Sequence, residues 1–142
     1  MKIEKAYENI EQVYKEIIED FLKINEGNLD QRLEQHSSML GFFNCVLAYA
    51  KKMLEKENLS LQILSAKCKE ERRDSVTKKI PAHEMQDYID AQDEITEQKS
   101  KIVTAEYKYN MAKGIVSALT SQKDLLVQIS SNRRHEQRLL TE

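Results

Sequence analysis

The sequence is poor in the residues that interrupt helices. Its 142 residues include three glycines, one proline and no tryptophan, whereas 32% of them are charged. This composition is too charged and too poor in turn residues for a β-sandwich or a doubly wound α/β domain. Because a domain has roughly 150 residues, the length indicates a single domain over 1–142. We therefore expect an all-α fold.

Long apolar runs and cysteines are also scarce. No window approaches the roughly 18 consecutive apolar residues of a membrane-spanning helix, and the acidic N-terminus lacks the apolar region of a signal peptide. Cys45 and Cys68 form neither a disulfide framework nor a metal pair at the usual ligand spacing. We interpret them as small core residues of a protein from a reducing compartment. The expectation is a soluble, cytoplasmic protein with no membrane partner.

Side chains that carry catalysis or bind metals are scattered. His36, His83 and His135 lie in different segments, and the one pair at helical spacing is His83 with Asp87, four residues apart at a helix start. The sequence has no glycine-rich phosphate loop, no nucleophile elbow and no cluster of cysteine and histidine. We therefore expect no enzymatic activity, no cofactor and no metal site.

One helical face is acidic. The segment 81–98 has six acidic and no basic residues, and Asp87, Asp90, Glu94 and Glu97 share one face of a helix. Such a face can hold Mg²⁺, but it is more often solvated, which is the interpretation we favour. A third interpretation pairs this face with basic residues across a helical hairpin. Part of the positive charge would then be neutralised within the chain.

Charge is segregated along the chain although the net charge is only −2. Residues 1–35 have 5 basic and 9 acidic side chains, residues 36–80 have 9 and 5, and residues 99–142 have 8 and 4. Local stripes of charge determine the field that a ligand experiences, so the net charge does not exclude a polyanionic partner. It does argue against a strong, indiscriminate binder that acts as a monomer.

Apolar residues recur at alternating spacings of three and four, the pattern of helices that pack on other helices. The pattern begins at Ile3 and, with interruptions, ends at Leu126. It is weakest around Pro81, which favours a connector there. The predicted elements are an N-terminal helix (1–26), a long helix (29–73), a connector (74–83), a long C-terminal helix (84–132) and a basic tail (133–142).

The two long helices are expected to form an antiparallel hairpin. The N-terminal helix would either pack on the open end of this hairpin or cross to another subunit. Gln98 and Lys123 fall inside the apolar stripe of the C-terminal helix. Polar residues at such positions suggest sites that set the register, or an interface that is not fully dry.

Basic residues are dense around the connector. A run of lysines on a helix is usually solvated, but this density, with Lys78 and Lys79 in the connector, raises the prospect of a phosphate-binding end. Platforms for stacking bases are few, because only Tyr88, Tyr107 and Tyr109 are available and Tyr109 lies in the apolar stripe. Any binding of nucleic acid would therefore be mostly electrostatic.

At this point the sequence resembles the UvsY-type recombination mediators of tailed phages. The resemblance is clearest over 88–129, which begins with Tyr88, Ile89 and Asp90, continues with acidic positions and a long helix, and ends in a small, apolar segment. Gln35 and His36, before the aromatic flank and Lys51, resemble the start of the family's first long helix. Together these stretches cover about two-thirds of the chain.

The resemblance implies a non-enzymatic protein of DNA recombination and repair, in the host cell cytoplasm if a phage encodes it. Proteins of this family bind single-stranded DNA, form rings of six or seven subunits, and load a RecA-like recombinase while displacing single-strand-binding protein. Their DNA-contacting stretch falls on 65–69 here, which matches Lys67 and Lys69. Their C-terminal helices drive ring assembly, which places Val116, Leu119, Leu126 and Ile129 at subunit contacts.

The resulting candidates form two sets. Those for binding nucleic acid are Lys51, Lys52, Lys67, Lys69, Arg72, Arg73, Lys78, Lys79, Arg133 and Arg134. Those for the oligomer interface are Tyr109, Val116, Leu119, Leu126 and Ile129.

Two other classes of protein remain open. A coiled-coil scaffold would oligomerise without any salt-sensitive affinity for oligonucleotides. A curved, BAR-like dimer would bind anionic lipid through its basic stripes and would co-sediment with liposomes. A single-strand annealing protein is a neighbour of the favoured interpretation that the sequence does not separate from a recombinase loader.

Overall fold

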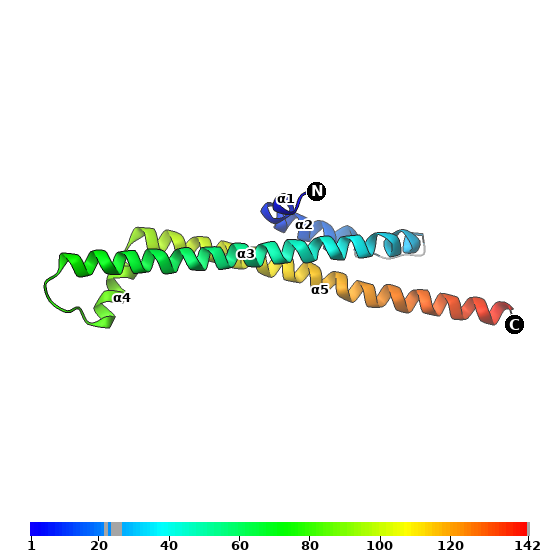
Figure 1. Cartoon of the computed structure of the whole chain (residues 1–142). Helices are drawn as coiled ribbons and strands as arrows, with labels where there is room; N and C mark the ends of the chain where they lie inside the picture. Colours follow the sequence, from blue (N-terminus) through cyan, green and yellow to red (C-terminus); the bar gives the residue numbers. More distant parts are fainter. Residues whose placement is uncertain (22, 24–26, 142) are drawn as a thin grey trace. The chain divides into compact units, whose positions relative to one another are not determined.

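The protein is all-α over the residues described by the structure, a computed structural model that covers 1–21, 23 and 27–141 (Figure 1). This confirms the predicted fold class for those residues. The elements in chain order are α1 (Ile3–Glu8), α2 (Ile10–Glu16), the π-helix η1 (Ile17–Phe21), α3 (Leu29–Ser75), α4 (Ala82–Asp90) and α5 (Asp93–Thr141).

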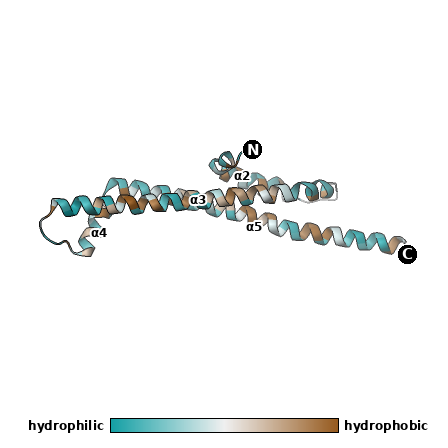
Figure 2. Cartoon of the chain, in the orientation of Figure 1, coloured by the Kyte–Doolittle hydropathy of each residue, from teal (hydrophilic) through white to brown (hydrophobic). Residues whose placement is uncertain are grey.

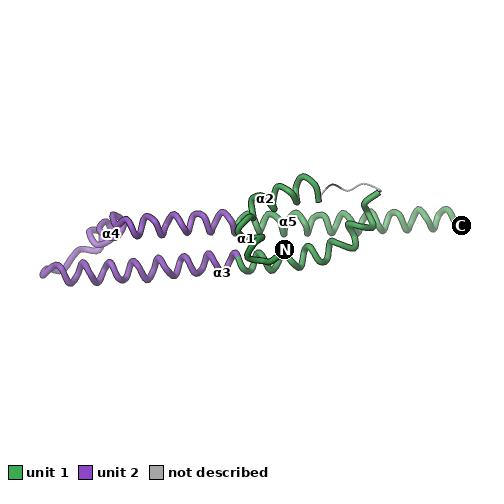
Figure 3. The backbone as a smooth tube through the Cα atoms, turned by 90° about the horizontal axis from the view of Figure 1, so that it is seen from above, with its two compact units in different colours: residues 1–49, 110–142 green, residues 50–109 purple. Residues whose placement is uncertain are grey.

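The chain divides into two compact units (Figure 3). Unit 1 comprises Met1–Tyr49 and Asn110–Glu142, and unit 2 comprises Ala50–Tyr109. Each unit contains a part of α3 and a part of α5. In Figure 2, hydrophilic and hydrophobic residues alternate along both helices, as expected of helices that bury one side.

The N-terminal helix predicted over 1–26 is wrong in its continuity, because α1 and α2 are separated at Asn9. The side chain of Asn9 donates from Nδ2 to the carbonyl oxygen of Lys5 at 3.0 Å. Asparagine competes in this way with the hydrogen bonds of a helix, which favours an interruption. The predicted helix end at 25–26 lies outside the described residues.

The N-terminal elements pack on the chain's own long helices within unit 1. The rings of Tyr7 and Tyr49 meet edge to face, 5.2 Å between centroids, and Gln122 donates from Nε2 to the carbonyl oxygen of Phe21 at 3.1 Å. Gly114 permits a close approach, since a Cβ atom there would lie 3.1 Å from the ring of Tyr14. Of the two placements left open by the sequence, packing on the same chain is the one observed.

The core of unit 1 joins α3 to α5. The buried imidazole of His36 lies with Nε2 at 2.6 Å from the carbonyl oxygen of Leu119, so Nε2 carries the proton in this contact. Ile115, Leu119 and Leu126 are almost completely inaccessible to solvent, as is Val46 on α3. His36 therefore has a structural role, with its donor satisfied inside the core.

The core of unit 2 gathers Cys68 of α3, Met85 and Ile89 of α4, and Ile95 of α5. Gln98 is buried beside this core and donates from Nε2 to Glu57, at 2.8 Å to the carbonyl oxygen and 2.7 Å to Oε2. A buried amide held by two hydrogen bonds fixes one pairing of α3 with α5, because any other pairing leaves it unsatisfied. This is the polar position that the sequence predicted.

Lys123, the other predicted polar position in the stripe, is exposed, and Gln122 is buried in its place. Gln122 lies on the same side of α5 as the buried Ile115, seven residues earlier, and its Nε2 donates to the carbonyl oxygen of Phe21 at 3.1 Å. The N-terminal elements thus cover a second side of α5, which buries Gln122 and leaves Lys123 exposed. The strict heptad assumed from the sequence was therefore wrong at this position.

The predicted helix over 84–132 is corrected at both ends. It is interrupted between α4 and α5, where the backbone N–H of Gln92 donates to the carbonyl oxygen of Ile89 at 3.1 Å in a tighter turn. The carbonyl oxygen of Gln92 then accepts the first hydrogen bonds of α5. At the other end α5 continues to Thr141, because the supposed tail over 133–142 has neither glycine nor proline to end a helix.

Gly41 offers a test of this description of α3. It lies within the helix, and a Cβ atom there would meet nothing within 4 Å. Because alanine favours a helix over glycine by about 1 kcal/mol, Gly41→Ala is expected to raise the free energy of unfolding by about that amount. Urea denaturation followed by circular dichroism measures it. A loss of stability would contradict a regular, uncrowded helix at this position.

Candidate nucleic-acid interface

A basic groove lies at the end of unit 2, where α3 gives way to α4. Helix α3 ends at Ser75, whose Oγ donates to the carbonyl oxygen of Arg72 at 2.9 Å. The segment 76–81 then leads into α4, with Pro81 at its N-cap position. Proline has no N–H to leave unsatisfied at a helix start, so it suits this place. The connector is thus shorter than the predicted 74–83.

This connector groove has a volume of about 640 Å³. Four of its lining residues are cationic and none is acidic, and we call Lys69, Arg73, Lys78 and Lys79 the groove cations. The complete lining is Lys69, Arg73, Thr77, Lys78, Lys79, Ile80, Ala82, Met85, Gln86 and Ile89. The groove therefore combines cations from α3 and the connector with apolar side chains from α4.

The positive charge of the groove is not neutralised by ion pairs. Over the part of the chain that the structure describes, no carboxylate lies within ion-pair distance of a groove cation. The N-terminus of α4, which has no side-chain cap, adds the positive end of a helix dipole beside the groove. Four uncompensated cations and a helix N-terminus favour an anionic ligand.

The acidic face does not neutralise the cations as one interpretation supposed. Asp90 forms its ion pair with Lys99, Oδ1 to Nζ 3.1 Å, and accepts a hydrogen bond from Gln86 at 2.8 Å. The hydrogen bond from Gln86 and the ammonium group of Lys99 lower the pKa of the Asp90 carboxyl. Asp87, Glu94 and the rest of this face are exposed, as the solvated interpretation expected.

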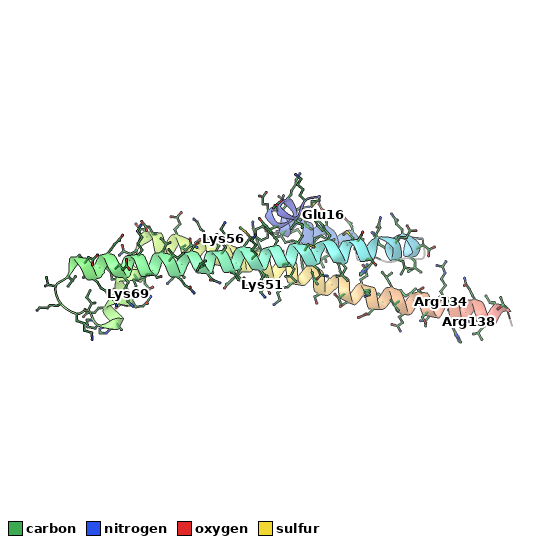
Figure 4. The ribbon with its side chains drawn as sticks, viewed as in Figure 1. Glu16, Lys51, Lys56, Lys69, Arg134 and Arg138 are labelled. Atoms are coloured by element: carbon green, nitrogen blue, oxygen red, sulfur yellow. The ribbon has the colours of Figure 1, made fainter. Side chains whose placement is uncertain are left out.

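The remaining candidates of unit 2 lie outside the groove. Arg72 is half-buried, with its guanidinium 4.9 Å above the ring of Tyr88, so both side chains are occupied in packing. Lys67 is exposed on α3 but does not line the groove. Lys51 and Lys52 are exposed on α3, and Figure 4 shows Lys51 and Lys69 on that helix. Of the predicted residues, the structure thus brings four together.

The predicted basic residues of unit 1 are separate. Arg133 forms an exposed ion pair with Asp30, Nη1 to Oδ1 3.4 Å, whereas Arg134 is exposed near the end of α5 (Figure 4). An exposed pair of this kind contributes little to stability. It does reduce the charge that Arg133 offers to a ligand.

Two of the predicted subunit contacts are explained within one chain. Leu119 is 0% and Leu126 is 1% exposed, so neither presents a surface to a partner. Tyr109, Val116 and Ile129 are half-buried. The prediction is therefore corrected for the two leucines, since the apolar stripe assigned to a subunit contact is occupied by the chain's own α3 and N-terminal elements.

Thr77 and Gln86 line the groove but were not recognised from the sequence. Neither type of residue is distinctive in a loop or on a helix. The available signal was the position of Gln86 one helical turn after Ala82, on the side of α4 that faces the connector.

The two thiols are expected to differ in reactivity. Burial, reinforced by Glu71 and Glu94, raises the pKa of the Cys68 thiol, whereas Cys45 is exposed. Only thiolates react readily with disulfide reagents. At pH 8, Ellman's reagent should therefore modify Cys45 first and Cys68 only after unfolding. Equal rates in the folded protein would contradict the packing of unit 2.

Over residues 1–21, 23 and 27–141, no three side chains of histidine, cysteine, aspartate or glutamate gather as metal ligands would. In the same residues, no helix has the length and apolar character needed to cross a bilayer. Comparisons of the chain with protein-family models, with curated proteins and with solved structures find no match.

Proposed function

We propose that this protein binds single-stranded DNA through the connector groove and acts as a recombination mediator in the cytoplasm. In this role it would assemble into a ring of six or seven copies and load a RecA-like recombinase as it displaces single-strand-binding protein. The observation that carries the DNA-binding part is the connector groove, with four cations and no acidic residue. The mediator part rests on the resemblance of the sequence.

The groove suits a phosphate backbone better than a base. Its cations attract phosphates at any sequence, and contacts of this kind supply most of non-specific affinity. Tyr88 lies under Arg72, whereas Tyr107 is 49% exposed on α5. With few aromatic platforms, binding should be electrostatic and should lack sequence preference.

Repetition of the groove would make binding strong. About two phosphate contacts per copy give weak binding, whereas a ring of six or seven copies gives on the order of 13 contacts on one strand. A strand held at regular intervals around a ring would be extended, which would help a recombinase to start a filament. The proposed ring would thus combine several weakly binding grooves into one particle that binds a strand tightly.

We also propose that α3 and α5 pair in antiparallel fashion. In unit 1, His36 lies against Leu119, and Asp30 lies against Arg133. The lower number on α3 thus goes with the higher number on α5, as an antiparallel pairing requires. In unit 2, the short path from Ser75 of α3 to Ala82 of α4 supports the same arrangement.

A loading assay tests the mediator part. Single-stranded DNA is coated with single-strand-binding protein, and the DNA-dependent ATPase of a RecA-like recombinase is followed with and without this protein. We expect the protein to shorten the lag before hydrolysis. A variant with alanine at the four groove cations should leave the lag as long as it is without the protein. If the wild type binds DNA but does not shorten the lag, the mediator role is refuted and DNA binding stands alone.

A further inference from the structure

The C-terminal end of α5 has no buried residue, and its ion pair among the described residues is the exposed contact of Arg133 with Asp30. Every residue over 131–141 is exposed, including Leu139 at 59% and Leu140 at 87%. Figure 3 shows α5 continuing past the start of α3, with the C-terminus at its tip. Helices in proteins gain most of their stability from packing of an apolar face, and the leucines of this end are exposed in their own unit. Two adjacent exposed leucines identify the apolar side of that contact.

An apolar groove in unit 1 lies between the N-terminal elements and α3. It has a volume of about 400 Å³, a size that accommodates several side chains. We call it the N-terminal groove; its lining is Met1, Val13, Glu16, Ile17, Ser38, Met39, Phe42 and Phe43. The only charged side chain among these is that of Glu16, which is exposed at the end of α2 (Figure 4). The end of α5 in the same chain is exposed throughout and thus does not fill this groove.

The two surfaces are complementary in charge as well as in hydropathy. Residues 1–21 have six acidic and three basic side chains. Residues 131–141 have three arginines and one glutamate, and Arg134 and Arg138 are exposed without an ion pair among the described residues. A basic helix with exposed leucines fits an apolar groove that carries Glu16 and lies on acidic N-terminal elements, as in other helix-in-groove recognition.

We propose that the end of α5 of one copy docks into the N-terminal groove of a second copy, with Leu139 and Leu140 in the groove and Arg138 beside Glu16. Each copy then offers one helix end and one groove. This head-to-tail contact builds a ring when its rotation closes. The proposal rests on the proposed assembly into an oligomer, but not on DNA binding.

Mass measurements on variants test this contact. The tail variant, Leu139→Ser with Leu140→Ser, keeps the groove, and the groove variant, Met39→Glu, keeps the tail. We expect each alone to dissociate to the mass of one chain, 16.6 kDa, at concentrations where the wild type is assembled. The dissociation constant should rise by about a hundredfold, since two leucines are no longer buried. The control, Gln137→Ser with Thr141→Ser, changes polar residues of the same turns and should assemble like the wild type.

A mixture of the two variants gives the sharpest result. The intact tail of one should bind the intact groove of the other, so a one-to-one complex of twice 16.6 kDa forms and grows no further. If Met39→Glu does not fold, the exposed Glu16→Arg serves instead. Glu16→Arg should weaken assembly, and the double variant Glu16→Arg with Arg138→Glu should restore it.

The outcomes separate the two levels of the proposal. A tail variant that assembles like the wild type would overturn this contact and leave the groove to another partner, with the proposed oligomer intact. A mixture that stays monomeric would show that the tail uses a different receptor surface, which also overturns it. A wild type that is monomeric at every concentration would refute both the contact and the proposed ring. DNA binding is measured separately and does not enter this test.

Discussion

Alanine at the four groove cations is expected to lower the affinity for single-stranded DNA by about two to three orders of magnitude near 0.1 M salt. Each phosphate contact to a single strand releases about 0.7 counterion. With about two phosphate contacts per copy, the slope of log affinity against log salt falls in magnitude by about 1.4 for each groove that holds the strand, and by nearly three for two grooves. The measurement is fluorescence anisotropy of a labelled oligo-dT over a range of salt concentrations.

A control variant separates the groove from general charge. Alanine at Lys2, Lys5, Lys101 and Lys123, which are all exposed and lie outside the groove, removes the same charge. We expect it to lower the affinity much less, through the long-range field alone. Circular dichroism should be unchanged in both variants, because exposed side chains are replaced. Equal salt slopes for the groove variant and the wild type would refute the groove as the DNA site.

Leu119→Ala is expected to lower the free energy of unfolding by about 2 to 5 kcal/mol. Its side chain is fully buried within unit 1, so truncation leaves a cavity in the core. Urea denaturation of the wild type and the variant gives the difference. Leu125→Ala is the matched control, because Leu125 lies on the same helix but is 48% exposed, and its effect should stay within about 0.5 kcal/mol.

The same variant distinguishes a core role from a role in assembly. A residue at a subunit contact would leave the stability of the monomer unchanged and reduce only the mass of the assembly. If Leu119→Ala splits an oligomer without destabilising the chain, its assignment to the core of unit 1 is contradicted. From the structure we expect the opposite: Leu119→Ala lowers the free energy of unfolding of the chain before it changes the mass of the assembly.

The helical class and the approximate extent of α3 could be predicted because they depend on local pattern. A stripe of apolar residues and the scarcity of glycine and proline indicate long helices wherever they occur. The burial of Gln98 was also foreseen, since a polar residue in an apolar stripe stands out. The structure adds the partner, Glu57, which is 41 residues away in the sequence.

The breaks between α1 and α2 and between α4 and α5 were not predicted, because the residues at these breaks give only weak signals in the sequence. At Asn9, one side chain competes for a single backbone carbonyl, and at Gln92 the chain tightens without glycine or proline. The acidic pair Asp93 and Glu94 at the start of α5 was the available signal, since acidic residues favour the first turn of a helix. The burial of Gln122 in place of Lys123 depends on the N-terminal elements, which cover a second side of α5 where Gln122 bonds to Phe21.

The site could be predicted in part. Basic density around the connector identified the groove cations by type and location. Their separation from Lys67, which stays outside, and from Arg72, which stacks on Tyr88, depends on where each side chain lies around α3. The sequence also placed Leu119 at a subunit contact, because an apolar stripe does not reveal whether its partner is the same chain or another copy.

The central claim is that this protein binds single-stranded DNA electrostatically as an assembled particle. Its most direct test is the anisotropy of a labelled oligo-dT with the wild-type protein at two salt concentrations, with mass photometry on the same sample. We expect binding that weakens steeply with salt, by a particle of several 16.6 kDa chains. No binding at low salt would contradict it and would leave an all-α protein whose partner is something other than DNA.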